Sequence, residues 1–404
     1  MLAAQIFLVF FLIALAGVPL MFALLSTTLG MVVFKGLGYP FETILLSFVG
    51  GVEPFILIAV PLFIFAGELL AHGGVGKRIV DFARVLFGWM PGGLGVVTVV
   101  SCLMFGGVSG SAIADTAAIG SLVIPSMVER GYSRGFAAAV SMRSLSMAGL
   151  LPALVSALAL IVVCIWYGKT TGCDNGEERA TWRQILTATR VAGPALLMPV
   201  IIVGGIWSGY FTPTEAAAVA VVYGLTVSML LYKDLRWRQI PALLLKAFQT
   251  SATVMLVIGA TGALAWLITA EQVAVQLAQW VELVADKPWV FLLLVNISLL
   301  LLGIFIEPLP ALLLTAPLFL PLAQTFKIDL VHLGVVMTAN LAIALYTPPV
   351  GGTLFVAAKL AKAGIGEVTR HLAPLMVAIL VVVTVITYVP GLSTWLPRWI
   401  ASWG

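Results

Sequence analysis

Several small and polar residues interrupt the otherwise apolar stretch 102–127. Ser109, Gly110, Ser111 and Asp115 lie together in this stretch. Serine hydroxyls, carboxylates and the carbonyls of unwound backbone are oxygen ligands, which hard cations such as Na⁺ prefer. In lipid, a broken helix is tolerated only beside protein or a water-filled cavity, and an intramembrane acid marks a functional site by default. These residues are candidate ion or substrate ligands; alternatively, the small residues only permit close helix packing while Asp115 pairs internally.

A second candidate site is the motif Thr347-Pro348-Pro349-Val350-Gly351-Gly352-Thr353, which interrupts the apolar run 332–358. Two prolines remove two backbone donors and free the carbonyls upstream, and glycines let the backbone approach a ligand closely. Since a structural kink usually needs only one proline, the motif predicts part of an ion or substrate site. Asn340 is a neighbouring candidate. The residues proposed from this segment are Asn340, Thr347, Pro348, Pro349, Gly351 and Thr353.

Glu307 and Pro308 begin a third polar interruption, in the stretch 301–325. Glu307 could be an ion ligand, a proton carrier or the charge at a helix N-terminus, and the sequence leaves these three roles open. The segment 211–215 has a simpler explanation, because Thr212 can cap a helix that starts at Pro213.

A different chemistry is conceivable at 107–110, because Gly-Val-Ser-Gly matches the GxSG pattern around the nucleophile of rhomboid-type intramembrane serine proteases. Such an enzyme pairs the serine with a histidine. The candidates His72, His332 and His371 each fall at a polar joint between apolar runs. The protease is therefore a remote alternative, and the chain is not expected to be an enzyme.

The elements that position these residues must be membrane helices. Of the 404 residues, 61% are hydrophobic and 9% are charged, whereas soluble domains carry about 45–50% apolar and about 25% charged residues. Since roughly 20 apolar residues cross a bilayer, the sequence supplies about ten membrane-crossing or membrane-entering segments. The basic residues form no stripe, which argues against nucleic-acid binding. The run 2–25 lacks the features of a cleaved signal peptide and is expected to be a retained helix.

The polar joints predict how the chain is oriented. The joints 169–190 and 233–246 hold eight basic residues between them. They flank 191–231, which is long enough for two helices broken near Pro213, so both joints lie on one side. The positive-inside rule makes that side cytoplasmic. The amphipathic joint 73–84 is predicted to lie in the membrane interface.

The chain also contains an internal repeat. At an offset of 196 residues, Gly107 pairs with Gly303 and Pro125 with Pro321. Broken helices or re-entrant hairpins at matching places in two halves are typical of transporters. The predicted parts are a first repeat at about 54–167 with a hairpin at 102–128, central helices at 191–231, and a second repeat at about 247–389 with a hairpin at 301–325 and a broken helix at 332–360.

The two repeats differ in length. Pro152 and Pro374 look like counterparts, but they are 222 residues apart. Compared with the offset of 196, the first repeat is therefore about 26 residues short after its hairpin, opposite the segment 341–360.

Four long stretches, 60–94, 106–132, 210–225 and 340–359, resemble the large membrane subunit of tripartite ATP-independent periplasmic (TRAP) transporters. The resemblance covers almost the whole chain. It implies a single all-α polytopic permease domain over 1–404, with about 10–11 transmembrane helices in two inverted repeats. Each repeat would contribute a re-entrant helical hairpin, and an elevator-type shift would move the hairpins against a scaffold that includes 1–28 and 191–231.

The resemblance also implies a function. A Na⁺ gradient would drive uptake of an organic acid, such as a C4-dicarboxylate, across the bacterial inner membrane, with no cofactor besides the coupling ion. The partners would be a small TRAP membrane subunit and a periplasmic solute-binding protein. Na⁺ is expected at Ser109, Gly110, Ser111, Thr347 and Pro348, and the wider ion and substrate region at Asp115, Glu307, Pro308, Asn340, Pro349, Gly351 and Thr353.

The sequence departs from the family pattern after the first hairpin. Family members have a Gly-Pro-rich broken helix there, of the type GPIIPPS, whereas 136–155 continues directly into the next helix with Arg143 in the middle. This difference leaves an alternative open. The chain would then be a transport-impaired subunit that keeps the scaffold and the partner-docking surfaces but lacks a complete first-half ion site.

Overall fold

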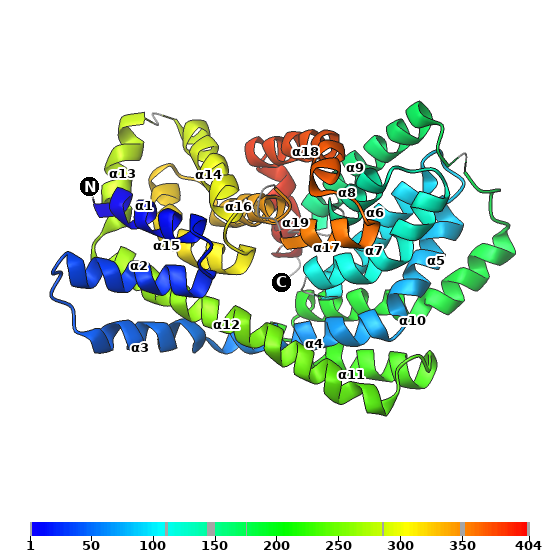
Figure 1. Cartoon of the computed structure of the whole chain (residues 1–404), viewed down its shortest axis with the longest axis horizontal. Coiled ribbons are helices and arrows are strands. Elements are labelled where there is room, and N and C mark those ends of the chain that lie inside the picture. Colours follow the sequence, from blue (N-terminus) through cyan, green and yellow to red (C-terminus); the bar gives the residue numbers. More distant parts are fainter. Residues whose placement is uncertain are drawn as a thin grey trace. The chain divides into compact units, whose positions relative to one another are not determined.

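In the computed structural model, the described residues are 2–109, 112–143, 150–174, 176–284, 287–347 and 352–401. Every regular element in these ranges is a helix, and none is a strand (Figure 1). Helices suit so apolar a chain, because they satisfy their own backbone hydrogen bonds in lipid. The all-α polytopic fold expected from the sequence is confirmed.

Seven helices in the described part of the chain are long and apolar enough to cross a membrane. Six shorter apolar helices of 10–17 residues accompany them. The predicted number of about ten segments therefore requires some of the shorter helices to enter the membrane as well. The seven candidate spans are Phe55–His72, Leu151–Thr171, Trp182–Trp207, Pro213–Leu231, Trp237–Ala270, Pro308–Thr325 and Ile365–Tyr388.

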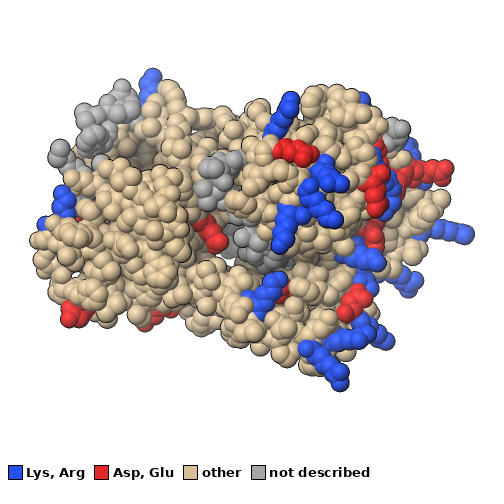
Figure 2. Space-filling model, viewed as in Figure 1, with Lys and Arg blue, Asp and Glu red and all other residues tan. Residues whose placement is uncertain are grey.

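The chain divides into two compact units. The first unit comprises Met1–Leu57, Ser251–Thr347 and Ile386–Trp395, and the second comprises Ile58–Thr250, Pro348–Val385 and Leu396–Gly404. On the face that Figure 2 shows, charged side chains gather over the second unit, whereas the surface of the first unit is mainly uncharged.

Seven helices lie wholly in the first unit: α1 (Leu2–Leu15), α2 (Leu20–Phe34), α3 (Phe41–Val52), α13 (Val273–Val284), α14 (Pro288–Gly303), α15 (Pro308–Thr325) and α16 (Leu330–Ala344). The chain passes between the units within η1 (Phe55–Ile58), α12 (Ile240–Ala270), α18 (Ile365–Tyr388) and α19 (Gly391–Ala401). Small residues bring helices close together here. A Cβ on Gly262 of α12 would lie 2.8 Å from the Cα of Gly51 in α3, so these two helices meet backbone to backbone.

The remaining helices lie in the second unit: α4 (Ala59–His72), α5 (Val75–Phe87), α6 (Gly93–Ser109), α7 (Ala112–Glu129), α8 (Arg134–Arg143), α9 (Leu150–Thr171), α10 (Trp182–Trp207), α11 (Pro213–Thr226), η2 (Val227–Leu231), η3 (Trp237–Gln239) and α17 (Gly352–Ala361). Two local predictions are confirmed. Thr212 caps α11, since its Oγ1 accepts a hydrogen bond from the Glu215 amide at 3.3 Å. The amphipathic helix α5 buries Val75, Ile79 and Phe82 against α6 and α10.

The helix bounds follow the 196-residue offset. Helix α7 begins at Ala112 and ends at Glu129, and α15 begins at Pro308 and ends at Thr325, each 196 residues later. The preceding helices α6 and α14 and the following helices α8 and α16 correspond in the same way. We call α6–α7 the first hairpin and α14–α15 the second hairpin.

The halves diverge after these helices. In the second half, α16 is followed by α17 and then by the long helix α18. In the first half, α8 ends after ten residues, at Arg143, and the next described helix is the long α9. Among the described residues, the first half therefore has one helix fewer than the second.

Helix α10 contains Pro194, which lacks a backbone N–H, and a tyrosine repairs the ladder beside it. The Tyr232 hydroxyl donates to the Val191 carbonyl at 2.9 Å and accepts from the Ala195 amide at 3.2 Å. In a regular helix, that amide would bond that carbonyl directly. Tyr232 thus satisfies two backbone groups that the proline separates.

We expect Tyr232→Phe to lower the thermal unfolding temperature of the detergent-purified protein, since a lost hydrogen bond costs about 1 kcal/mol. The matched control is Tyr210→Phe, because the Tyr210 side chain is 83% exposed. Equal unfolding temperatures for the two variants would contradict this role of Tyr232.

Candidate functional site

The predicted site residues fall into two sets. Ser109, Asp115 and Thr353 lie in the second unit, and Glu307, Pro308, Asn340 and Thr347 lie in the first. Gly110, Ser111, Pro348, Pro349 and Gly351 lie outside the described residues, as does the side chain of Ser109. The predicted Na⁺ set therefore stays a prediction, and the two sets are described separately below.

Asp115 lies in the first turn of α7, where a negative charge is stabilised by the helix dipole. Its side chain is buried, with the residue 2% exposed. Thr116 beside it is fully buried and donates to the Ala112 carbonyl at 2.8 Å. An acid held this deep in the first hairpin matches the expectation that this end of α7 is polar inside an apolar protein. Thr353, in the first turn of α17, is also fully buried.

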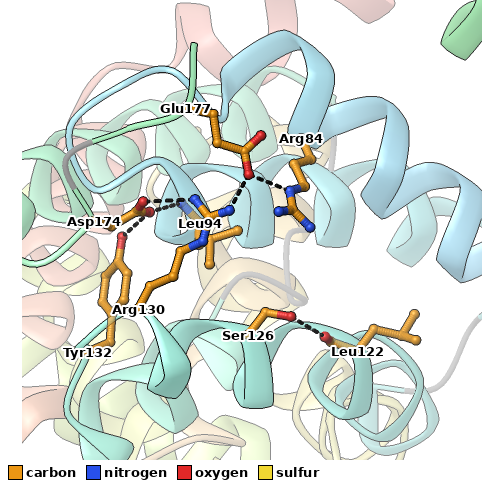
Figure 3. A network of polar contacts seen from close by, with 8 residues as sticks. All are labelled: Arg84, Leu94, Leu122, Ser126, Arg130, Tyr132, Asp174 and Glu177. Carbon is orange, nitrogen blue, oxygen red and sulfur yellow. Dashed lines mark hydrogen bonds and ion pairs between the residues drawn. The ribbon is translucent and has the colours of Figure 1, made fainter.

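The opposite end of the first hairpin is held by an ionic network (Figure 3). Asp174, in the loop after α9, accepts hydrogen bonds from the Leu94 amide at 2.8 Å and the Tyr132 hydroxyl at 3.1 Å. Its other carboxylate oxygen lies 3.1 Å from the Arg130 guanidinium. Leu94 begins α6 and Arg130 follows α7, so one buried carboxylate ties together both ends of the hairpin.

Glu177 extends this network. Its carboxylate pairs with Arg130 and, at 2.6 Å, with Arg84 of α5. Burial would lower the pKa of Arg130, but its hydrogen bonds to Glu177 and Asp174 outweigh that effect and raise it. Burial, and then the nearby Asp174 charge, raise the pKa of Tyr132, which keeps its hydroxyl a donor. The sequence showed the 169–190 joint only as a determinant of orientation, and its acidic residues among basic ones were the available signal.

Asp174→Ala should destabilise the protein by about 1.5–3 kcal/mol, the range for one hydrogen bond to a charged group. The reason is that Arg130 and the first turn of α6 would lose their buried acceptor. Thermal unfolding of the purified protein measures the loss. Glu178→Ala is the control, because Glu178 is an exposed acid in the same loop. An equal change in both variants would show that the hairpin does not depend on Asp174.

In the second hairpin, Glu307 is the residue before α15, and Pro308 is the first residue of that helix. Proline suits this position because its missing amide would have no partner there. The Glu307 side chain is exposed and makes no capping hydrogen bond to the helix. Its three possible roles therefore stay open.

Asn340 belongs to a buried polar cluster in the first unit. Its amide nitrogen donates to the Asn296 side-chain oxygen and, at 2.8 Å, to the Val336 carbonyl. Asn296 in turn bonds the Thr387 hydroxyl at 3.1 Å. Asn340 is fully buried, and its own side-chain oxygen accepts no hydrogen bond from the described residues. The cluster links α14, α16 and α18 close to the predicted site.

His332 completes the polar cluster. Its Nε2 lies 3.0 Å from the Thr387 carbonyl. The sequence placed His332 at a polar joint, which is wrong, because it is a helical residue only 1% exposed. Asn296, His332 and Thr387 were not among the predicted site residues, since they are distant in sequence from every motif.

The Thr347 hydroxyl donates to the Ile343 carbonyl at 3.2 Å, one turn back in the chain. The residue is half-buried, directly after α16. The described residues include no group of three or more His, Cys, Asp or Glu side chains that could hold a metal. A cation bound within these residues would therefore rely on hydroxyl, amide and carbonyl oxygens together with single carboxylates.

Comparison with known proteins decides the family. A family model described as "Tripartite ATP-independent periplasmic transporter, DctM component" matches residues 7–144 and 137–392. The chain belongs to this family. TRAP large permeases are transport proteins and not enzymes, so the intramembrane protease is rejected and the resemblance seen in the sequence is confirmed.

Two relatives show how far the similarity extends. The chain is 37% identical to the C4-dicarboxylate TRAP transporter large permease protein DctM of Pseudomonas aeruginosa over 374 residues, which cover 86% of this chain and 87% of that protein. It is 34% identical to the sialic acid TRAP transporter large permease protein SiaM of Vibrio cholerae over 418 residues, which cover 96% and 97%. Among solved structures, the YdaH transporter of Alcanivorax borkumensis shares the fold with a TM-score of 0.57 and 15% identity, over 95% of this chain and 98% of that one.

The alignments contain positions that this TRAP permease chain does not fill. The SiaM alignment has 418 positions but uses 96% of 404 residues, about 388, which leaves about 30 positions without a counterpart here. The match to the family model is divided at 137–144. That division falls in the segment where the sequence predicts missing length; the domain boundaries themselves remain predictions.

Proposed function

We propose that this chain is the large permease subunit of a Na⁺-coupled secondary transporter that imports an organic acid across the bacterial inner membrane. A periplasmic solute-binding protein would deliver the acid, and a small TRAP membrane subunit would complete the membrane complex. Family membership is the observation that carries the proposal. The substrates named for the two relatives, C4-dicarboxylates and sialic acid, both bear carboxylates, which supports a carboxylate substrate here.

In this proposal, the tips of the two hairpins and the interruption after Thr347 bind the ion and the acid. Asp115 and Asn340 support it, because both are polar side chains buried in apolar surroundings next to those interruptions. Burying such groups costs free energy unless they are paired, so their presence in a membrane helix favours a functional role. The transport step would be an elevator-type shift of the hairpins.

The direct test is uptake into proteoliposomes that contain both membrane subunits, with the cognate binding protein outside. A labelled C4-dicarboxylate and labelled sialic acid are the first substrates to test. We expect uptake of an acid that requires an inward Na⁺ gradient and the binding protein. Uptake that persists without Na⁺, or that an ATP requirement explains, would contradict the proposal.

Thr347→Val should lower Na⁺-stimulated uptake about ten-fold, the effect of losing about 1.4 kcal/mol of binding, while expression is retained. The variant keeps the shape of the side chain and removes only the hydroxyl. Thr338→Val is the matched control, since Thr338 lies on α16 and bonds the Gly334 carbonyl in the same way. If both variants transport like the unmodified protein, Thr347 is not part of the ion site.

The alternative of a transport-impaired subunit rests on the short first half. It has a specific signature in the same experiment, because such a subunit would still assemble with the small membrane subunit. Assembly without Na⁺-dependent uptake of any acid that the cognate binding protein delivers would favour this alternative.

A further inference from the structure

A cavity of about 290 Å³ lies in the second unit, where the end of α5 meets the start of α10. Its walls are mostly apolar and include one cation, Arg179. The residues that line it are Val85, Leu86, Trp89, Arg179, Ala180 and Ile185. The proposed transport site does not use any of them.

Arg179 is held against the wall of this cavity by an aromatic ring. The centre of its guanidinium lies 4.3 Å from the centroid of the Trp89 ring. The Trp89 indole N–H donates to the Leu86 carbonyl at 2.9 Å, which fixes the ring. No carboxylate oxygen of the described residues lies within 4.0 Å of the guanidinium. Its charge is therefore available to a ligand, while the stacking on Trp89 stabilises its position.

The loop that carries Arg179 is fixed to the same wall. The Glu177 amide donates to the Gly88 carbonyl at 2.9 Å, and the Glu177 carboxylate is already paired with Arg84 and Arg130. Gly176 has a φ of +83°, and a Cβ there would lie 2.5 Å from the Trp89 carbonyl. Only glycine fits so close an approach, so the loop and the cavity wall form one preorganised surface.

The cavity opens where polar and apolar surfaces meet. Trp182, at the start of the membrane-spanning α10, is 75% exposed, and Leu186, one turn further on, is 59% exposed. Arg183 adds a second exposed cation, and Glu178 is the exposed acid beside Arg179. Aromatic and basic side chains at the end of a span are typical of the membrane interface, and the positive-inside rule puts this end in the cytoplasm.

We propose that this cavity binds an anionic phospholipid. The phosphate would pair with Arg179, and an acyl chain would follow the exposed apolar side chains of α10 from Leu186 onward. Charge complementarity supports an anionic headgroup, since basic pockets on the cytoplasmic side of membrane proteins bind such lipids. The apolar lining favours a lipid over free phosphate, which would leave most of the cavity wall without contact.

The test is native mass spectrometry of the full-length protein in detergent, titrated with phosphatidylglycerol or phosphatidylcholine. We expect Arg179→Gln to bind phosphatidylglycerol about five-fold more weakly, the effect of one basic residue near an anionic membrane surface, with phosphatidylcholine binding unchanged. Arg238→Gln is the matched control, because Arg238 is an exposed cation at another polar joint. It should bind phosphatidylglycerol like the unmodified protein.

Three results would overturn the proposal. The first is unchanged phosphatidylglycerol binding by Arg179→Gln, and the second is an equal loss in Arg238→Gln, which would indicate attraction by total charge only. The third is displacement of the lipid by millimolar inorganic phosphate, which would assign the cavity to a free anion. Thermal unfolding of each variant in phosphatidylcholine establishes that it is folded, and Trp89→Leu, which keeps the charge but removes the stacking, should also weaken phosphatidylglycerol binding.

Discussion

The structure depends on one constraint, that backbone amides and carbonyls inside a bilayer must find partners within the protein. A continuous helix meets this constraint by itself, but each interruption requires a specific group. Helix α10 illustrates the point, because Tyr232 supplies one hydroxyl that bonds both the carbonyl and the amide beside Pro194. At α15 the chain uses a different solution, since Pro308 removes a donor where the helix begins. Interruptions in this permease are therefore positions with defined chemistry.

The same constraint explains why the polar residues of the candidate site are anchored at a distance from the predicted ligands. Asp174 satisfies the start of α6 and binds the arginine after α7, which fixes the base of the first hairpin. In the first unit, Asn296 and Thr387 orient Asn340 two turns before Thr347. A hairpin fixed at its base and a helix fixed near its end can present ligands without the cost of ordering the whole element.

Local sequence signals predicted the features that depend on neighbouring residues. The apolar composition gave the all-helical membrane fold, the Thr212–Glu215 cap was readable from five residues, and the family followed from four long motifs. Contacts between distant residues could not be read in this way. Asn340 and Asn296 are 44 residues apart, and Asp174 meets Leu94 across 80 residues. Whether a polar side chain in a joint faces solvent or binds a helix end is decided by packing, which a single sequence does not encode locally.

The unequal halves limit how the chain could couple an ion to transport. A helix interrupted inside the membrane needs both a proline or glycine motif and a partner hairpin, and the second half retains both in the run from α14 to α17. In the first half, α8 has ten residues, and the described chain resumes with α9 and without a counterpart of α17. If an ion site requires an interrupted helix from each half, this chain can build only one such site by that route. Any second ion would then depend on the oxygen groups of the first hairpin itself, and Asp115 is the charged residue buried there.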